Sequence, residues 1–545
     1  MTDASQAERL LVAVACASNR SIAGSSWDGA LFGAQDEADL PAGGGIAASE
    51  LGLDASERIV SREVVDALAA WGVRIAEPGE RADFTLDEVD AILRDPPARR
   101  SGQARVVYAR AYMPCIRALA AQYGKDGADG QGADGGGGEG AELGRGAVAG
   151  GDGAGVEQGA DAGGRGLFAG VRIGCWLIIE PKTAVLLHYL REMGAEVALA
   201  CGSTSVDADV LDALRAAGIR VYADADGTQE GDRANALRLL DEHAPEILLD
   251  DGAALSRLAF LERPALARSL RGICEETTSG VAALEAMEAD GTLLVPAVAV
   301  NDAAAKTRFD NAHGTGETVL ANVVKLVGSL AGQRVLVSGY GPVGRGLAKR
   351  CRAAAGTVEI SEVSPVAALE AMHDGFRVRP AAEAAAEADL ILSASGVRGT
   401  VGLPVLRAAK PDAVVAVAGG TWQEVSLADA LAEPDAAWDD TDKDRCVLTL
   451  GAKHLTVLSG GHGVNYTSGG GNSIETMDLS FAAQLEGLAW LLRDGSGLPA
   501  GVHRLPAEVS ERIVALKLAS SAVRVDAQEA PYDWRLTKLG TGSEE

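Results

Sequence analysis

The chain has 545 residues, of which 47% are hydrophobic and only 4% aromatic, so we expect several domains with cores of aliphatic side chains. Its 49 Lys and Arg against 77 Asp and Glu give a net charge of −28, which argues against nucleic-acid binding. No apolar run reaches the ~18 residues of a membrane span, and the acidic N-terminus is unlike a secretory leader. We therefore expect a cytoplasmic protein that binds no membrane.

Seven cysteines are scattered along the chain without any Cys-x-x-Cys pair. This pattern is typical of reduced thiols in a protein core and argues against a zinc site or a disulfide framework. The sequence therefore predicts no metal site.

Residues 1–104 carry a predicted strand at 10–17 (LLVAVACA) and a predicted helix at 60–72 (VSREVVDALAAWG). No motif with chemical meaning occurs in this region, so its role stays unassigned. Residues 124–166 are mostly Gly, Ala and Asp and have too few large side chains to offset the entropy of ordering. We expect a flexible insert there.

From Val171 onward, short apolar runs alternate with amphipathic helical stretches, which predicts parallel sheets with helices on both faces. The first series has expected strands at 171–179, 196–202, 219–223 and 246–252, and a helix at 183–194. After a helical stretch at 317–332, the second has expected strands at 334–339, 357–362, 389–395 and 413–419. Helices at 474–492 and 505–519 are expected to return to the first unit. The fold class is α/β, with two doubly wound parallel-sheet domains.

A glycine-rich turn follows the expected strand at 334–339. In RVLVSGYGPVGRG the glycines Gly339, Gly341 and Gly344 end that strand and open a helix, which is the arrangement that binds a dinucleotide pyrophosphate. Glu362, at the end of the next strand, would accept hydrogen bonds from both ribose hydroxyls and repel a 2′-phosphate. The motif predicts NAD as the cofactor; the alternative is a turn without a ligand.

Acidic pairs stand at the ends of two other apolar runs. Asp250 and Asp251 end EILLDDG, and Glu275 and Glu276 precede three hydroxyl residues in ICEETTSG. Ligands bind at the carboxyl ends of strands in an open parallel sheet, so these acids are candidate site residues. The alternative is that they cap the helices that follow.

Lys306, Asp310 and Asn311 occur in NDAAAKTRFDNAHG, with the first two four residues apart. On a helix they share one face, and the plain alternative is a surface ion pair. Their occurrence together with a dinucleotide turn favours a functional reading, because a cofactor that takes a hydride needs a nearby group for the hydroxyl proton. Among the seven histidines, His462 in SGGHGVNY is the best candidate for a site role, although a solvent-exposed turn is the favoured interpretation.

Several long stretches then resemble one enzyme family: GCWLIIEPKTAVL, ILLDDGAAL, CEETTSGV, VPAVAVNDAAAKTRFDNAHGTGE, VLVSGYGPVGRG with EISEVSP, and VNYTSGGGNSIETMDLSFAAQ. From about Tyr108 to Val525, without the insert, the chain resembles the S-adenosylhomocysteine hydrolase (adenosylhomocysteinase) family. The resemblance implies a tightly bound NAD that oxidises the ribose 3′-hydroxyl, elimination of the 5′ thiol, addition of water and reduction of the ketone. It also implies a nucleoside substrate, a place in one-carbon metabolism and a homo-oligomer, either a tetramer or a dimer.

The resemblance assigns roles by position. Lys306 and Asp310 would handle the proton of the 3′-hydroxyl, and Asp251 and Glu276 would hold the sugar and assist acid–base steps. These four catalytic residues would also bind the substrate, together with Glu180 and Thr183. The residues that would contact NAD are Thr277, Thr278, Ser279, Asn311, Gly339, Gly341, Pro342, Val343, Gly344, Arg345, Gly346, Glu362, Gly419 and Asn465.

Three histidines that the family places around its substrate are replaced here by Ile178, Gly420 and Asn472. Two hypotheses follow. The first is an NAD-dependent enzyme of this family that oxidises S-adenosylhomocysteine or a related nucleoside and cleaves its thioether. The second is an NAD-binding paralogue without hydrolysis, either an altered nucleoside or sugar oxidoreductase or a regulatory pseudoenzyme.

The expected domains follow from these assignments. They are an N-terminal extension at 1–104, a substrate-binding domain at 105–123 and 167–318 around the insert at 124–166, a Rossmann NAD-binding domain at 319–470, and C-terminal helices with a tail at 471–545.

Overall fold

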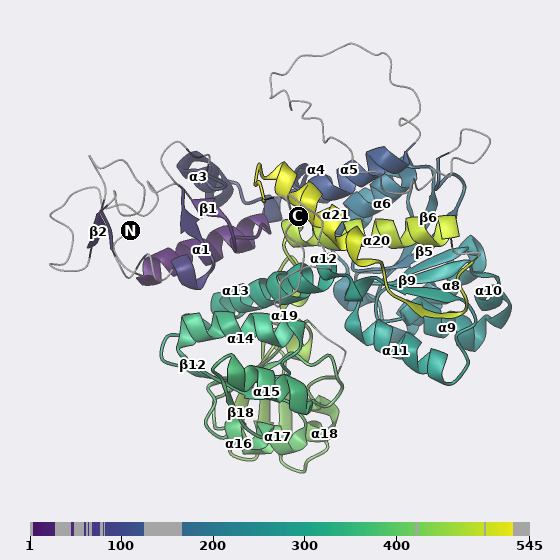
Figure 1. Ribbon diagram of the computed structural model, residues 1–545. Coiled ribbons are helices and arrows are strands. Elements are labelled where there is room, and N and C mark those ends of the chain that lie inside the picture. The colour runs from purple at the N-terminus through teal and green to yellow at the C-terminus, as the bar shows by residue number, and fades with distance from the viewer. Residues whose placement is uncertain are drawn as a thin grey trace, which may run out of the picture.

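The computed structural model describes residues 4–27, 45–47, 59–61, 64, 68–76, 80, 82–124, 166–419, 423–494 and 497–526. They form two parallel-sheet units and a smaller N-terminal segment beside them (Figure 1). Nearly all of the predicted flexible insert lies outside the described residues. The expected α/β class with two doubly wound sheets is confirmed.

The first sheet is parallel throughout and has the strand order β19-β10-β9-β8-β5-β6-β7. Its strands are β5 (Arg172–Trp176), β6 (Glu196–Ala200), β7 (Arg220–Tyr222), β8 (Ile247–Asp250), β9 (Gly272–Glu275), β10 (Pro296–Ala299) and β19 (Gly501–His503). Its helices are α6 (Pro181–Glu192), α7 (Ala208–Ala216), α8 (Gln229–His243), α9 (Ala254–Glu262), α10 (Pro264–Ser269) and α11 (Thr278–Ala289). The order reverses between β5 and β8, and ligands bind at such a reversal.

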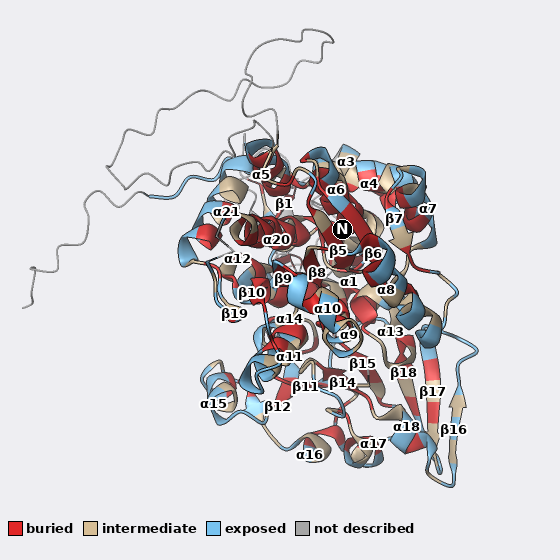
Figure 2. Cartoon of the chain, turned by 90° about the vertical axis from the view of Figure 1, so that its right-hand side faces the viewer, coloured by how far each residue is buried: buried red, intermediate tan, exposed pale blue. Residues whose placement is uncertain are grey.

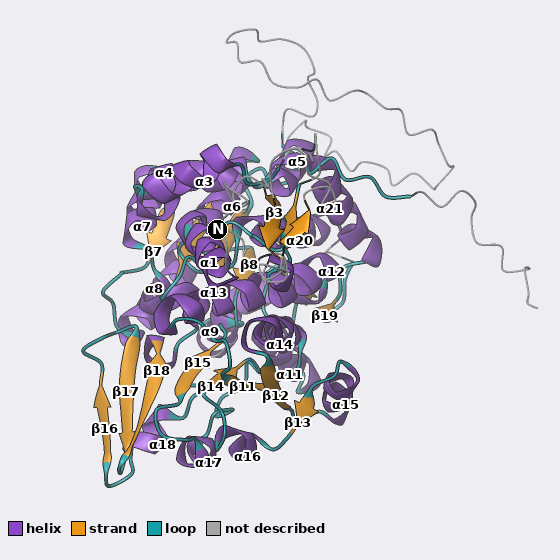
Figure 3. Ribbon diagram, turned by 90° about the vertical axis from the view of Figure 1, so that its left-hand side faces the viewer, coloured by secondary structure: helices purple, strands orange, loops and turns teal. Residues whose placement is uncertain are grey.

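The second sheet has the order β13-β12-β11-β14-β15-β18-β17-β16, whose first six strands follow the dinucleotide-binding order 3-2-1-4-5-6. Its strands are β11 (Arg334–Ser338), β12 (Thr357–Ser361), β13 (Arg377–Val378), β14 (Leu390–Ser393), β15 (Val414–Val417), β16 (Ala436–Asp439), β17 (Arg445–Leu450) and β18 (Lys453–Leu458). Its helices are α14 (Pro342–Ala355), α15 (Pro365–His373), α16 (Ala381–Ala385), α17 (Leu403–Ala408) and α18 (Leu427–Leu431). Strands β16 to β18 form an antiparallel edge that projects from the unit (Figure 3).

The chain passes twice between the two sheets. The first crossing leads from β10 to β11 through a 3₁₀ turn (Val300–Asp302), α12 (Ala304–Lys306), a π-helix η8 (Thr307–Thr315) and α13 (Gly316–Val327). The second crossing leads from β18 through a turn η9 (Ser459–Gly461) and α19 (Val464–Thr467) to α20 (Ile474–Asp494). Figure 1 shows α12, α13 and α19 between the two units.

The C-terminal helices return to the first sheet, as predicted. Helix α20 packs with α4 (Gly102–Ala111), α5 (Pro114–Tyr123), α6 and α21 (Ala507–Ser520) in one apolar core. Figure 2 shows that buried residues dominate α20 and the strands next to it. A helix buried nearly all round holds a fixed place against its neighbours, so the second crossing is fixed at its C-terminal end.

The N-terminal segment contains α1 (Ala4–Ser18), β1 (Ser26–Trp27), β2 (Gly45–Ala47), β3 (Ile59–Ser61), β4 (Arg74–Ile75), α3 (Leu86–Arg94) and the turn η4 (Pro97–Arg99). The predicted strand at 10–17 is wrong, because these residues belong to α1. Its buried residues Ala7, Leu11 and Val14 recur at helical spacing and pack against α13. The predicted helix at 60–72 is helical at Val64 and 68–70, while its first two residues lie in β3.

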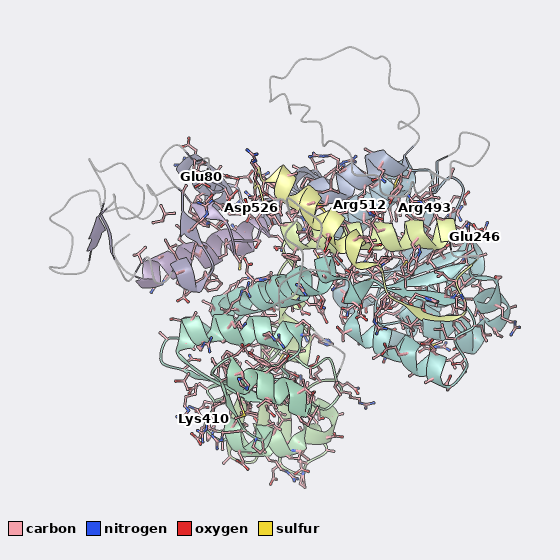
Figure 4. All side chains as sticks on the ribbon, viewed as in Figure 1. Glu80, Glu246, Lys410, Arg493, Arg512 and Asp526 are labelled. Atoms are coloured by element: carbon pink, nitrogen blue, oxygen red, sulfur yellow. The ribbon has the colours of Figure 1, made fainter. Side chains whose placement is uncertain are left out.

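All seven cysteines are free thiols, and six of them are buried. Within the part of the chain that the structure describes, no helix is both long and apolar enough to cross a membrane. Charged side chains cover the outer surfaces, for example Lys410 on the lower unit and Glu246 on the other (Figure 4). Several charged residues that the sequence singled out, among them Glu276, Lys306 and Asp310, are instead buried.

Candidate active site

The first crossing carries a buried cluster of a lysine, a carboxylate and an amide. Lys306 Nζ lies 2.7 Å from Asp310 Oδ2 and donates to Asn311 Oδ1 at 2.7 Å. Lys306 and Asp310 are only 5% and 2% exposed, so the predicted pair is present but is no surface ion pair. Asp310 and Asn311 lie on the π-helix η8, an uncommon element that is frequent at functional sites.

The second crossing holds the other oxygen of Asp310. Asn472 Nδ2 donates to Asp310 Oδ1 at 2.6 Å and to Thr315 Oγ1 at 2.9 Å. Asn465 Nδ2 donates to Asn472 Oδ1 at 3.0 Å. The two crossings thus share one hydrogen-bond network around the Asp310 carboxylate, which fixes its position.

In each of the two acidic pairs at the strand ends, one residue accepts hydrogen bonds from the backbone at the start of a helix. Asp250, at the end of β8, accepts from the backbone N–H of Leu255 and Ser256, and Glu275, at the end of β9, accepts from those of Gly252 and Ala253. Asp250 stabilises the start of α9, the helix that follows it, as the capping alternative stated. Glu275 also stabilises the start of α9, whereas Thr277 caps α11, the helix that follows Glu275. Their neighbours Asp251 and Glu276 lack this helix-start role.

Asp251 and Glu276 are close enough to Lys306 for their charges to interact. Burial raises the pKa of Asp251 to about 7, and the negative charges of Glu276 and Asp250 add to this effect, while Lys306 opposes it. Burial also raises the pKa of Glu276, which accepts from Ser480 Oγ at 3.0 Å. Burial alone would lower the pKa of Lys306, but Asp310 and Glu276 outweigh it, so the net shift is upward. Lys306 is therefore held as an ammonium ion.

Glu180 and Lys182 form a second buried pair, shortly after β5. Lys182 Nζ lies 2.5 Å from Glu180 Oε2, and Lys182 is 1% exposed. Burial raises the pKa of Glu180 to about 7 although Lys182 opposes the shift. Glu180 lines a cavity of about 280 Å³ next to Ile178, and Thr183 is buried in the first turn of α6.

The glycine-rich turn has the shape that the motif predicts. Gly339 has φ +107°, a value that side chains rarely allow, and a Cβ on Gly344 would lie 2.0 Å from Gly339 O. A Cβ on Gly346 would lie 1.7 Å from Ala312 O of η8, so α14 packs directly on the helix that carries Asp310. Among the described residues, no atom lies within 4 Å of a Cβ built on Gly341. A pyrophosphate can therefore approach the start of α14.

The other residues proposed to contact NAD lie around this turn. Glu362, directly after β12, accepts from Tyr340 N at 2.6 Å and from Val363 N at 2.7 Å, which holds its carboxylate beside the turn. Pro342 and Val343 open α14, whereas the side chain of Arg345 pairs with Glu370 on α15. The groups directly beside the turn are therefore backbone N–H groups and the Glu362 carboxylate, while the Arg345 guanidinium is engaged by Glu370.

The hydroxyl and amide residues at the start of α11 are joined by hydrogen bonds to the lysine cluster. Thr277 caps α11, and Ser279 Oγ lies 3.4 Å from Thr277 Oγ1. Thr278 Oγ1 donates to Asn301 Oδ1, and the same oxygen accepts from Asn311 Nδ2. The Oδ1 atom of Asn465 is buried without a hydrogen-bond partner among the described residues. A Cβ on Gly419 would lie 2.6 Å from that same oxygen. The unpartnered Oδ1 atom of Asn465 and the space in front of Gly341 both fit a bound NAD.

The three positions at which the resemblance implies a histidine differ in character. Ile178 lines the cavity and can transfer no proton, while Asn472 is a hydrogen-bond donor to Asp310. Gly420 lies outside the described residues. His462, the histidine singled out in the sequence, is absent from the lining of this cavity, and burial lowers its pKa.

Sequence reasoning missed four residues that the structure places in these networks, namely Asn19, Lys182, Asn301 and Ser480. Lys182 stands inside the stretch EPKT that carries the resemblance, so spacing from Glu180 could have identified it. No signal in the sequence connects Asn19 with Lys182, which stands 163 positions away.

Replacing Glu180 by glutamine is expected to change how stability depends on pH. The native pKa of Glu180 is about 7 against its usual 4.5, so the folded state binds the extra proton and loses stability as pH rises from about 4.5 to 7. A glutamine side chain does not titrate. The variant should match the wild type near pH 4.5 and exceed it by roughly 3 kcal/mol above pH 7 in urea unfolding. The exposed Glu383→Gln is the control, and a Glu180→Gln effect that is equal at every pH would contradict the assignment.

Comparison with known proteins identifies the family of this chain. Residues 311–471 match the model of the S-adenosyl-L-homocysteine hydrolase NAD-binding domain. The chain is 38% identical over 373 residues to an adenosylhomocysteinase of Archaeoglobus fulgidus, covering 67% of this chain and 92% of that protein. It is 36% identical over 363 residues to an S-inosyl-L-homocysteine hydrolase of Methanopyrus kandleri, covering 66% and 85%. The chain belongs to the S-adenosylhomocysteine hydrolase family and carries its NAD-binding domain.

Proposed function

We propose that the chain is an NAD-dependent hydrolase that cleaves the thioether of S-adenosylhomocysteine, or of a closely related nucleosyl-homocysteine, to give the nucleoside and homocysteine. The observation that carries this proposal is the buried Lys306–Asp310 pair on a helix that packs against the NAD-binding turn. A buried charge pair is expensive to maintain and contributes little net stability, so a role in chemistry explains it better than a role in folding.

The residues of the chain would act on protons around the sugar. NAD, when bound, would accept the hydride from the 3′-carbon and later return it. The Lys306 ammonium would stabilise the developing 3′-alkoxide, while the Asp310 carboxylate, held by Asn472, would take up the hydroxyl proton. This division follows from the raised pKa of Lys306, which favours the charged form over a free amine base.

Carboxyl groups would take over the proton transfers at the 5′ side. Ile178 supplies no titratable group at one position that the family gives to histidine. Asp251 and Glu180 each have a pKa of about 7, which is the range in which a group works as acid and as base at neutral pH. Loss of the imidazoles therefore does not remove general acid–base groups from the site.

The base of the nucleoside has two candidates. Relatives named adenosylhomocysteinase and relatives named S-inosyl-L-homocysteine hydrolase match this chain at similar identity, 33–38%. A 6-aminopurine and a 6-oxopurine are therefore both substrates to test. The non-hydrolytic paralogue considered from the sequence is not favoured, because these relatives are named as hydrolases.

The purified chain is expected to carry NAD and to form enzyme-bound NADH on incubation with S-adenosylhomocysteine or its inosyl analogue. Absorbance at the NADH band measures the oxidation, and a thiol reagent measures the homocysteine released. Formation of NADH without thiol would support the non-hydrolytic paralogue instead. If neither compound, nor adenosine or inosine, reduced the bound NAD, the proposed chemistry would be wrong.

The assignment of regions follows the same proposal. We assign 105–123 and 167–318 to substrate binding, 319–470 to NAD, and 471–545 to helices that return to the first unit. We also infer a homo-oligomer and a cytoplasmic location. The free thiols support a reducing compartment, and light scattering of the purified chain tests the oligomer.

A further inference from the structure

One turn of the N-terminal segment, residues 18–22 at the end of α1, lies at the junction of the two units. Asn19 has φ +53°, and its carbonyl oxygen accepts from Ile474 N at 3.0 Å. Arg20 pairs with Glu475 at 2.9 Å, and Ile22 N donates to Glu317 at 2.7 Å. The turn therefore contacts both crossings, the first at α13 and the second at the start of α20.

The side chain of Asn19 enters the site. Its Oδ1 accepts from Lys182 Nζ at 2.7 Å, and its Nδ2 donates to Gly471 O at 3.1 Å. Asn19 occupies the space that a side chain on Gly470 would need, since a Cβ on Gly470 would lie 2.8 Å from Asn19 Nδ2. A Cβ on Gly471 would stand 2.8 Å from Glu180 Oε2. The glycines of TSGGGN thus make room for the N-terminal segment on one side and for Glu180 on the other.

Asn19 supplies one of the three hydrogen-bond acceptors around the Lys182 ammonium group. An ammonium has three N–H donors, and here they face Glu180 Oε2, Asn19 Oδ1 and Gly470 O at 2.5, 2.7 and 2.7 Å. The ammonium group of a lysine stands at the end of a flexible four-carbon chain. It takes a single position only when hydrogen-bond acceptors hold its N–H donors. Asn19 therefore fixes Lys182 and, through it, the carboxylate of Glu180.

The same segment forms part of the cavity wall. The cavity of about 280 Å³ that Glu180 lines is bordered by Ser18, Asn19, Pro97 and Ala98 of the N-terminal segment. These residues precede Tyr108, where the resemblance to the family begins. Tyr108 also lines the cavity, and its hydroxyl is buried without a hydrogen-bond partner among the described residues. A cavity with an unpartnered polar group on its wall has the character of a site for a small organic molecule.

We propose that Asn19 is a positioning residue of the nucleoside site, through which the N-terminal segment sets the Lys182–Glu180 pair for the ligand in this cavity. This inference rests on the proposed function for the identity of the ligand as a nucleoside. It gives a role to residues that carried no recognisable motif. The extension is then a part of the substrate site, and not an independent appendage.

The test uses the full NAD-loaded chain and replaces Asn19 by glycine, which removes the amide and still accepts a positive φ. We expect the Kd for adenosine or inosine, measured by calorimetry, and the KM for the thioether to rise about tenfold, because a hydrogen bond to a charged group is lost. The single-turnover rate of NADH formation and the bound NAD should stay within about twofold, since the hydrogen bonds of Asn19 reach neither the Lys306–Asp310 pair nor the glycine-rich turn.

Two variants separate positioning from folding. Ser21→Ala removes a hydrogen bond of the same turn, from Ser21 Oγ to Glu317, outside the cavity, and should leave the Kd and KM unchanged. Asn19→Asp keeps an acceptor for Lys182 and should recover most of the affinity. An unchanged Kd in Asn19→Gly, or an equal loss in Ser21→Ala, would overturn the positioning role. A wild type that binds a nucleoside without turnover would overturn the proposed function alone, and one that binds neither nucleoside would overturn both.

Discussion

Replacing Lys306 by methionine is expected to lower kcat by about 10³-fold while NAD stays bound. Methionine keeps the apolar stem and removes the ammonium that lies 2.7 Å from Asp310. Without that charge nothing stabilises the 3′-alkoxide, and loss of one acid–base or electrostatic group costs roughly 10²–10⁴-fold. The measurement is the single-turnover rate of NADH formation, with NAD content determined after acid release.

The chain offers a matched control in its other buried lysine. Lys182 is 1% exposed and paired at 2.5 Å with a carboxylate, so Lys182→Met makes the same change of side chain at a similarly buried lysine. It should raise the KM with a much smaller effect on the rate of NADH formation. Equal loss of that rate in both variants would show that both lysines act through the stability of the fold. Lys306 would then have no catalytic role.

Lys306→Met leaves Asp310 as an unpaired buried carboxylate, and breaking a buried pair costs about 3–5 kcal/mol. A loss of activity could then reflect unfolding. The double variant Lys306→Met with Asp310→Asn removes both charges and should recover most of the stability in urea unfolding. It should remain inactive, because the groups that move the proton are gone. Recovery of activity together with stability would contradict the catalytic assignment.

Most of the fold could be predicted because its signals are local. Most strands of the two sheets are apolar runs bounded by turn residues, and the helices between them show an apolar face. The same reasoning failed at residues 10–17. That run is short and apolar throughout, so periodicity could not separate strand from helix. Packing of α1 against α13 decided it, and these two helices lie far apart in the sequence.

The candidate site could be predicted less completely, for a physical reason. Asp250 and Asp251 are neighbours of the same chemical type, as are Glu275 and Glu276, so the sequence cannot tell which one faces the helix backbone. Only the direction of each strand end decides this. The spacing of Lys306 and Asp310 predicted their pairing, because a single helix turn sets it. Asn19 was out of reach, since its partners come from elements far apart in sequence.

Replacing Gly341 by alanine is expected to abolish tight NAD binding, with an affinity loss of at least ~100-fold, while the fold stays intact. Gly341 has φ −70°, and a Cβ there would meet none of the atoms that the structure describes within 4 Å. The methyl group would instead occupy the space through which a pyrophosphate reaches the first N–H groups of α14. The variant should show no rise in melting temperature on addition of NAD, whereas the NAD-stripped wild type should show one.

The control must carry the same helix-start cost, because alanine is a poorer N-cap than glycine by up to ~1 kcal/mol. Gly402 is the N-cap of α17 with φ −74° in the same sheet unit, and a Cβ there would lie 3.1 Å from Gly399 O. Gly402→Ala should therefore lose at least as much stability and keep its NAD response. Gly346→Ala gives the opposite contrast, since its Cβ would lie 1.7 Å from Ala312 O and should destabilise the junction itself. If Gly341→Ala still bound NAD, the cofactor would not approach this turn, and the Lys306–Asp310 pair on the adjoining helix would have no hydride acceptor beside it.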